Sequence, residues 1–246
     1  MLLPLNNVSA VFSQVLFPAL AQVQNNIPRF RQQYIRATGL IALITFPLMA
    51  GVAALAEPLI LLLLGPKWAE VIPIVQILSF VGMFQSICQP AGSVYTALGK
   101  TKSMFYVSVV LLVAFVMLMI PGIRFGLRGV TWAYTAWTAV SGLLNLWMVG
   151  RYVNSSALAI LTSVAPTAII AGLTGALVYA IDAGPAHAWP IAIRLLAGLF
   201  AGVTSYLLLC VVTKNRPFTD FVGLISERLG LDMVPYWARL RGLMNK

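Results

Sequence analysis

The chain has 246 residues, of which 60% are hydrophobic and only 9% are charged, and its mean hydropathy is +0.92. Because a soluble domain carries about 25% charged residues, this composition excludes a water-soluble fold and makes lipid the main solvent. The net charge of +10 does not indicate a nucleic-acid partner, since the basic residues stand in short breaks between long apolar runs.

Long apolar runs follow one another along the chain. A bilayer-crossing helix takes about 20 apolar residues, and six segments qualify: residues 37–56, 71–98, 103–123, 129–150, 158–181 and 191–213. Residues 1–21 form a weaker, more polar segment, predicted to be a helix inside the bundle or the end of a helix whose beginning is missing. None of the runs alternates with a period of two, as a membrane barrel requires. We therefore expect an all-α, polytopic transmembrane helical bundle.

Basic residues are unequally shared between the two sides of this predicted topology. One side carries twelve: Arg29, Arg31, Arg36, Lys100, Lys102, Arg151, Lys214, Arg216, Arg228, Arg239, Arg241 and Lys246. The other side carries four: Lys67, Arg124, Arg128 and Arg194. The positive-inside rule places the richer side, and with it the C-terminus, in the cytoplasm. The loops near Lys67, Arg124 and Asp182 are then short outer loops.

The tail from residue 214 onward has an amphipathic pattern. Thr219 is predicted to cap a helix that ends at Gly230. A second stretch places Trp237, Leu240 and Met244 on one face. Such helices suit the surface of an anionic inner leaflet, and a partly ordered tail is the alternative.

Residues capable of catalysis are not grouped anywhere in the sequence. The acidic residues stand at span ends, in loops or in the tail, His187 stands alone in a loop, and no phosphate loop or metalloprotease motif occurs. The two cysteines, Cys88 and Cys210, lie inside apolar runs without a metal-binding spacing. We therefore expect neither an enzyme nor a bound cofactor or metal. Glu57 is interpreted as a boundary carboxylate, with no identifiable partner for a coupling role.

Uncharged polar residues form two stripes inside predicted spans. The first combines Gln85, Gln89, Ser93 and Thr96 on one helix face, with a bend expected at Pro90. The second combines Thr131, Thr135, Thr138, Gly142 and Asn145, near Trp132, Tyr134 and Trp137. Either stripe makes interhelical hydrogen bonds, each contributing about 0.6 kcal/mol, or it lines a watery cavity. Amides, hydroxyls and aromatic rings suit sugars better than ions.

Several segments occur in an order typical of one protein family. SQVLFPALAQVQ is followed by NNIPRFRQQYIRA, by LIALITFPLMAGVAALAEPLILLLLGPKW, by ALGKTK and by IPGIRFGLRGVTWAY. This order resembles the C-terminal half of the polysaccharide and O-antigen flippases of the colanic-acid type. They belong to the multidrug/oligosaccharidyl-lipid/polysaccharide (MOP) exporter superfamily, which also holds the lipid II flippase.

The resemblance implies a MATE-like fold of two helical lobes in the bacterial cell inner membrane. It implies that undecaprenyl-pyrophosphate-linked oligosaccharide crosses by alternating access, for exopolysaccharide, O-antigen or capsule synthesis. Residues 1–150 would then be the C-terminal lobe, with a partial first helix and four transmembrane helices. Residues 151–213 would be two additional helices, and residues 214–246 the cytoplasmic tail. The N-terminal lobe is missing, so the chain is interpreted as a fragment, a misplaced start or half of a split gene.

Site candidates follow from the stripes and the resemblance together. The substrate-cavity candidates are Gln85, Gln89, Ser93, Thr131, Thr135 and Asn145. The anion-contact candidates are Arg124 and Arg128, for which interface snorkelling is an equal explanation. The expected partners are the lipid-linked oligosaccharide, membrane lipid and the missing N-terminal lobe. The alternatives are a drug/cation antiporter of the same superfamily, which the lack of an intramembrane carboxylate disfavours, and a non-transporting membrane scaffold.

Overall fold

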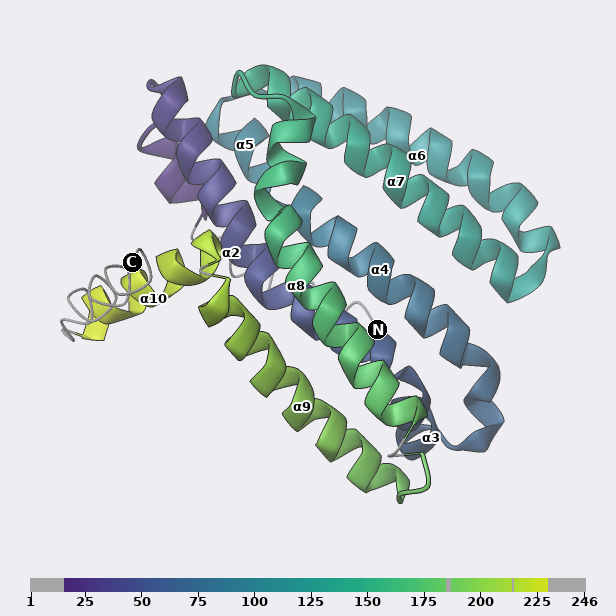
Figure 1. Ribbon diagram of the computed structural model, residues 1–246. Coiled ribbons are helices and arrows are strands. Elements are labelled where there is room, and N and C mark those ends of the chain that lie inside the picture. Colours follow the sequence, from purple (N-terminus) through teal and green to yellow (C-terminus); the bar gives the residue numbers. More distant parts are fainter. Residues whose placement is uncertain (1–15, 185–186, 214, 230–246) are drawn as a thin grey trace.

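The computed structural model describes residues 16–184, 187–213 and 215–229, and all regular structure in these ranges is helical. The expectation of an all-α polytopic bundle is therefore confirmed for the described chain. The helices are α2 Ile27–Ala54, α3 Ala56–Leu63, the 3-10 helix η1 Pro66–Val71, α4 Ile72–Cys88, α5 Ala91–Ala97, α6 Thr101–Arg124, α7 Gly126–Tyr152, α8 Ala157–Ala183, α9 Ile191–Val212 and α10 Arg216–Leu229 (Figure 1). The second amphipathic stretch of the tail and most of the weak N-terminal segment lie outside the described residues.

Helix α2 begins earlier than hydropathy predicts. Asn26 caps α2, because its side-chain oxygen accepts a hydrogen bond from the Arg29 N–H at 3.1 Å, and Pro28 occupies the first turn. The basic residues predicted to form a loop are therefore helical. They form the first turns of α2, which precede its apolar section.

The second span is two helices. Pro90 has no N–H to continue the ladder, so α4 ends at Cys88 and α5 begins at Ala91. The Pro90 carbonyl accepts from the N–H groups of Ser93 and Val94 at 3.1 and 3.3 Å, which restarts the helix. Pro90 therefore interrupts the helix, while the bend expected there stays a prediction.

Five of the described helical segments are long and apolar enough to cross a membrane: Ile27–Ala54, Pro66–Ala97, Thr101–Arg124, Ala157–Ala183 and Ile191–Val212. The fourth predicted span corresponds to α7, which has 27 residues but is not among the five. Its hydroxyls, amide and aromatic rings lower its hydropathy. It packs between α6 and α4, and the Trp137 indole N–H donates to the Leu111 carbonyl of α6 at 3.0 Å.

The core lies around α2, which contacts α4, α8, α9 and α10. Its largest fully buried side chains include Phe30, Tyr34 and Tyr95. Helices α6 and α7 form a hairpin that extends away from this core (Figure 1), and Gly122 is the one buried residue of α6. A Cβ on Gly129 would collide with the Gly122 backbone, so these glycines permit the close approach of α6 and α7.

One end of the bundle collects the basic residues of the predicted cytoplasmic side; we call it the basic end. There the Arg31 guanidinium donates to the Asn154 carbonyl at 3.2 Å, and Arg36 pairs with Asp220 of α10 at 3.2 Å. Helix α10 begins at Arg216, and the Thr219 hydroxyl donates to the Arg216 carbonyl from inside the helix. The prediction that Thr219 caps this helix is therefore wrong.

Candidate functional site

The first polar stripe surrounds the break between α4 and α5. Gln85 is half-buried and Gln89 is exposed, and among the described residues neither amide has a hydrogen-bond partner. Ser93 is buried while Thr96 is exposed. The break thus divides the predicted stripe, so its four side chains do not share one environment. What remains at the break is a pair of amides available to a ligand, to water or to another chain.

The second stripe meets the first near the basic end. The Tyr95 hydroxyl donates to Asn145 Oδ1 at 3.4 Å, and Asn145 Nδ2 donates to the Ser141 carbonyl at 2.9 Å. The Tyr95 ring also packs edge-on against Tyr152, with 5.8 Å between centroids. These contacts join α5 to α7. A polar group of the second stripe therefore forms a hydrogen bond between helices and stabilises the bundle.

Hydroxyls further along α7 bond within their own helix. Thr131 donates to the Leu127 carbonyl at 2.9 Å, and Thr135 donates to the Thr131 carbonyl at 2.8 Å. Thr138 Oγ1 is buried and has no hydrogen-bond partner among the described residues. Thr135 and Thr138 line a cavity of about 310 Å3 between α4 and α7, together with Ile77, Phe80, Val81, Phe84, Trp132 and Ala139. Most of this lining is apolar or aromatic.

The two anion-contact candidates lie apart from the amides. Arg124 and Arg128 are exposed beside the turn between α6 and α7. Figure 1 shows this turn at the end of the hairpin remote from α5. Arg128 and Asn145 are 17 residues apart on α7, or about 26 Å at 1.5 Å per residue. The structure does not bring the basic pair together with the rest of the candidate set.

A buried ion pair joins α8 to α9 at the end opposite the basic end. The Arg194 Nε and a terminal nitrogen donate to the two oxygens of Asp182, both at 2.8 Å, and the side chains are 5% and 6% exposed. Glu57 of α3 lies 3.6 Å from the same guanidinium, with its side chain 42% exposed. These three residues form the charge cluster. A bidentate pair with two parallel hydrogen bonds is the strongest geometry available to arginine.

Sequence reasoning missed this cluster. Asp182 was expected in a loop, but α8 continues to Ala183 and carries it into the bundle. Glu57 was interpreted as a boundary carboxylate without an identifiable partner, and in the structure it lies 3.6 Å from Arg194. The available signal was one arginine in the last span, twelve residues after an aspartate across a short turn. That spacing suits a pair across a helical hairpin, but only the packed helices show it.

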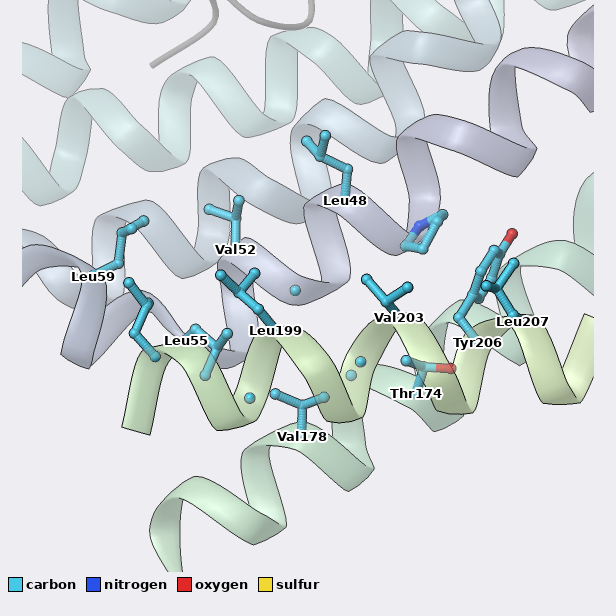
Figure 2. A pocket seen from close by; sticks show the side chains of 16 residues that line it. Leu48, Val52, Leu55, Leu59, Thr174, Val178, Leu199, Val203, Tyr206 and Leu207 are labelled. Atoms are coloured by element: carbon cyan, nitrogen blue, oxygen red, sulfur yellow. The ribbon is translucent and has the colours of Figure 1, made fainter. Parts of the chain in front are cut away.

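A groove runs between α2 and α9, with α8 contributing part of its wall. Its volume is about 410 Å3, and it is lined by Pro47, Leu48, Gly51, Val52, Leu55, Leu59, Thr174, Gly175, Val178, Leu195, Gly198, Leu199, Gly202, Val203, Tyr206 and Leu207. Figure 2 shows Leu48 and Val52 on the α2 side facing Leu199 and Val203 on the α9 side. The groove lies in apolar sections of three helices that are long and apolar enough to span a membrane.

Two features determine the shape of the groove. Pro47 has no N–H, so it leaves the Leu43 carbonyl without its usual helical donor; the Tyr206 hydroxyl donates to this carbonyl at 2.8 Å. A Cβ on Gly198 would lie 2.5 Å from the Leu55 side chain, so glycine allows α9 to approach the junction of α2 and α3. The Tyr206 hydrogen bond therefore holds α9 against α2 near Pro47, and the close approach at Gly198 holds α9 against Leu55.

Comparisons with known proteins point to polysaccharide biosynthesis. A family model described as "Polysaccharide biosynthesis protein" matches residues 1–73. The teichuronic acid biosynthesis protein TuaB of Bacillus subtilis is 25% identical over 229 residues, covering 92% of this chain and 47% of the relative. The succinoglycan biosynthesis transport protein ExoT of Rhizobium meliloti is 25% identical, covering 90% of this chain and 45% of the relative.

A third relative agrees with these two. The lipopolysaccharide biosynthesis protein WzxC of Escherichia coli is 26% identical, covering 62% of this chain and 31% of the relative. No solved structure gives a significant match. The chain thus spans less than half the length of each of these relatives. The predicted resemblance to proteins of polysaccharide biosynthesis and export is confirmed, and the chain is a multi-pass membrane protein.

Proposed function

We propose that the chain is one half of an inner-membrane flippase that translocates undecaprenyl-pyrophosphate-linked oligosaccharide by alternating access, for surface polysaccharide synthesis. The observation that carries this proposal is the pair of unpartnered amides, Gln85 and Gln89, beside a helix break within a membrane span. A break exposes polar groups where hydrocarbon would not tolerate them, so its place is beside protein or a watery cavity. Sugar hydroxyls are suitable partners for such amides.

The names of the relatives support the substrate class. Teichuronic acid, lipopolysaccharide and succinoglycan are all polysaccharide products, and the ExoT name includes transport. The antiporter alternative is less well supported. Coupling to a cation uses a carboxylate that is free inside the membrane, and the one buried aspartate in the described chain, Asp182, is held by Arg194.

The proposal includes a second half. Alternating access takes two repeats that move against each other around a site near the midplane, and this chain spans under half the length of its relatives. The missing N-terminal lobe would supply the opposite wall of a cavity beside Gln85, Gln89 and Asn145. Arg124 and Arg128 would then contact the pyrophosphate at the outer end of the path. The C-terminus would lie in the cytoplasm, as the distribution of basic residues indicates.

Complementation tests the proposal. A flippase-null strain receives this chain alone, or the chain with a separately expressed N-terminal lobe from a relative such as TuaB, and surface polysaccharide is measured. We expect only the pair to restore polysaccharide. The double variant Gln85→Ala/Gln89→Ala should abolish this rescue at equal membrane abundance. The control is Gln76→Ala, which removes an amide that already donates to the Ala53 carbonyl at 3.4 Å.

Three outcomes would contradict the proposal. Full rescue by the chain alone would show a complete transporter rather than a half. Rescue by the pair that survives the double alanine variant would show that the amides do not contact the substrate. Pairing of the two halves without any rescue would favour the scaffold alternative.

A further inference from the structure

We infer that the groove between α2, α8 and α9 holds a resident phospholipid with a primary ammonium headgroup, its acyl chain in the groove and its amine beside Glu57. This site is separate from the amides at the α4–α5 break and does not depend on the proposed transport activity. Three observations support it: the length of the groove, its lining and the charge at its end.

The groove has the length of one membrane leaflet. Its α9 wall runs from Leu195 to Leu207, about 18 Å at 1.5 Å per residue. One leaflet of a hydrocarbon core about 30 Å thick measures about 15 Å. Arg194, in the charge cluster, lies one residue beyond the groove and three residues inside the start of α9 at Ile191. The groove therefore begins near the start of α9 and ends about 8 Å beyond the middle of this 22-residue helix.

The lining suits hydrocarbon and excludes sugar. Of the lining residues, Thr174 and Tyr206 alone have polar side-chain atoms. The Tyr206 hydroxyl is bonded to a backbone carbonyl, while Thr174 Oγ1 is buried and has no hydrogen-bond partner among the described residues. A Cβ built on Gly51 would meet no atom within 4 Å, so the centre of the groove is open. An acyl chain in the groove packs against an almost entirely apolar lining by van der Waals contact, because the surrounding lipid tails are as apolar as the lining and add no hydrophobic driving force.

The charge at the end of the groove selects the headgroup. The charge cluster has two carboxylates and one guanidinium, so its formal charge is −1. Asp182 uses the Nε and one terminal nitrogen of Arg194 at 2.8 Å, which leaves Glu57, at 3.6 Å and 42% exposed, as the surplus anion. An anionic headgroup is repelled by this surplus. An ammonium group is attracted and is able to donate hydrogen bonds to the carboxylate.

The test measures lipid retention by the purified full chain. The chain is assembled in nanodiscs of equimolar dioleoyl-phosphatidylethanolamine and dioleoyl-phosphatidylglycerol, extracted into detergent, and the retained lipids are counted by native mass spectrometry. Phosphatidylethanolamine should be retained about fivefold over phosphatidylglycerol, the upper range for a partly exposed ion pair. Glu57→Gln should bring this ratio close to one, while Glu70→Gln, at an exposed carboxylate in η1, should leave it unchanged.

A second pair of variants tests the groove itself. Gly51→Leu fills the open centre and should remove retention of both lipids. Gly172→Leu is the matched control, because a Cβ there also meets no atom within 4 Å and the residue is exposed outside the groove. Equal retention of the two lipids by the wild type would overturn the headgroup assignment. Retention unaffected by Gly51→Leu would overturn the groove assignment.

A competition arm separates this proposal from the transport substrate. A polyprenyl phosphate is added to the nanodiscs at equal amount. If it displaces phosphatidylethanolamine from the wild type and from Glu57→Gln alike, the groove holds the tail of the lipid carrier and the proposal is wrong. If phosphatidylethanolamine remains bound to the wild type, the proposal stands whatever the result of the complementation test.

Discussion

Replacing Asp182 by alanine leaves Arg194 buried without its bidentate partner. Both side chains are nearly excluded from solvent, at 6% and 5% exposure, and both hydrogen bonds are 2.8 Å long. Removing one partner of a buried pair costs about 3–5 kcal/mol. Glu57, at 3.6 Å from the same guanidinium, offsets part of this cost, so we expect Asp182→Ala to lie at the lower end, about 3 kcal/mol.

Two companion variants make this expectation specific. Replacing both partners by leucine removes the unpaired charge, so the double variant should be close to neutral or more stable than the wild type, since such replacements change stability by about 1–4 kcal/mol in favour of the folded state. Glu57→Gln should cost no more than about 1 kcal/mol, because its side chain is 42% exposed and screened.

The free energy of unfolding is measured by titrating SDS into mixed detergent micelles and following tryptophan fluorescence. A cost below about 1 kcal/mol for Asp182→Ala, the range of a solvated surface pair, would refute the reasoning from burial. A double leucine variant as unstable as the single variant would show that lost packing, rather than the unpaired charge, is responsible.

The remaining predictions concern topology, the cavity and the helix core. A single cysteine at Lys67 should react with a membrane-impermeant maleimide added outside intact cells, and one at Lys100 should not; the reverse pattern would invert the topology. A cysteine at Gln89 should react with water-soluble reagents when the two halves are co-expressed, and one at Leu144 should not; equal reactivity would indicate loose packing. Tyr206→Phe leaves the Leu43 carbonyl without a hydrogen-bond donor. The midpoint of SDS unfolding should therefore fall by the equivalent of about 1–3 kcal/mol. An unchanged midpoint would mean that water or lipid replaces the hydroxyl.

The sequence by itself determined that the chain lies in lipid and that its apolar runs form helices. A chain that is 9% charged and 60% hydrophobic has to place its apolar runs in lipid, and in lipid the backbone has to satisfy its own hydrogen bonds as helices. Pro90 indicated an irregularity in the second span, and the helix is interrupted there, because the missing N–H is a local property. The starts of helices were less predictable: α2 begins ten residues before its apolar section because the Asn26 cap stabilises a polar first turn.

Only the tertiary structure decided which polar residues are engaged. Asn145 and Gln89 look alike in the sequence, yet Asn145 contacts Tyr95 of another helix while Gln89 has no partner among the described residues. Asp182, Arg194 and Glu57 come from three segments, and their pairing depends on the angle and register at which α8 and α9 pack beside α3. Register is set by side-chain shape, such as the absent Cβ of Gly198 against Leu55. Hydrophobic periodicity does not encode such contacts, because it reports the depth of a residue and not its neighbour.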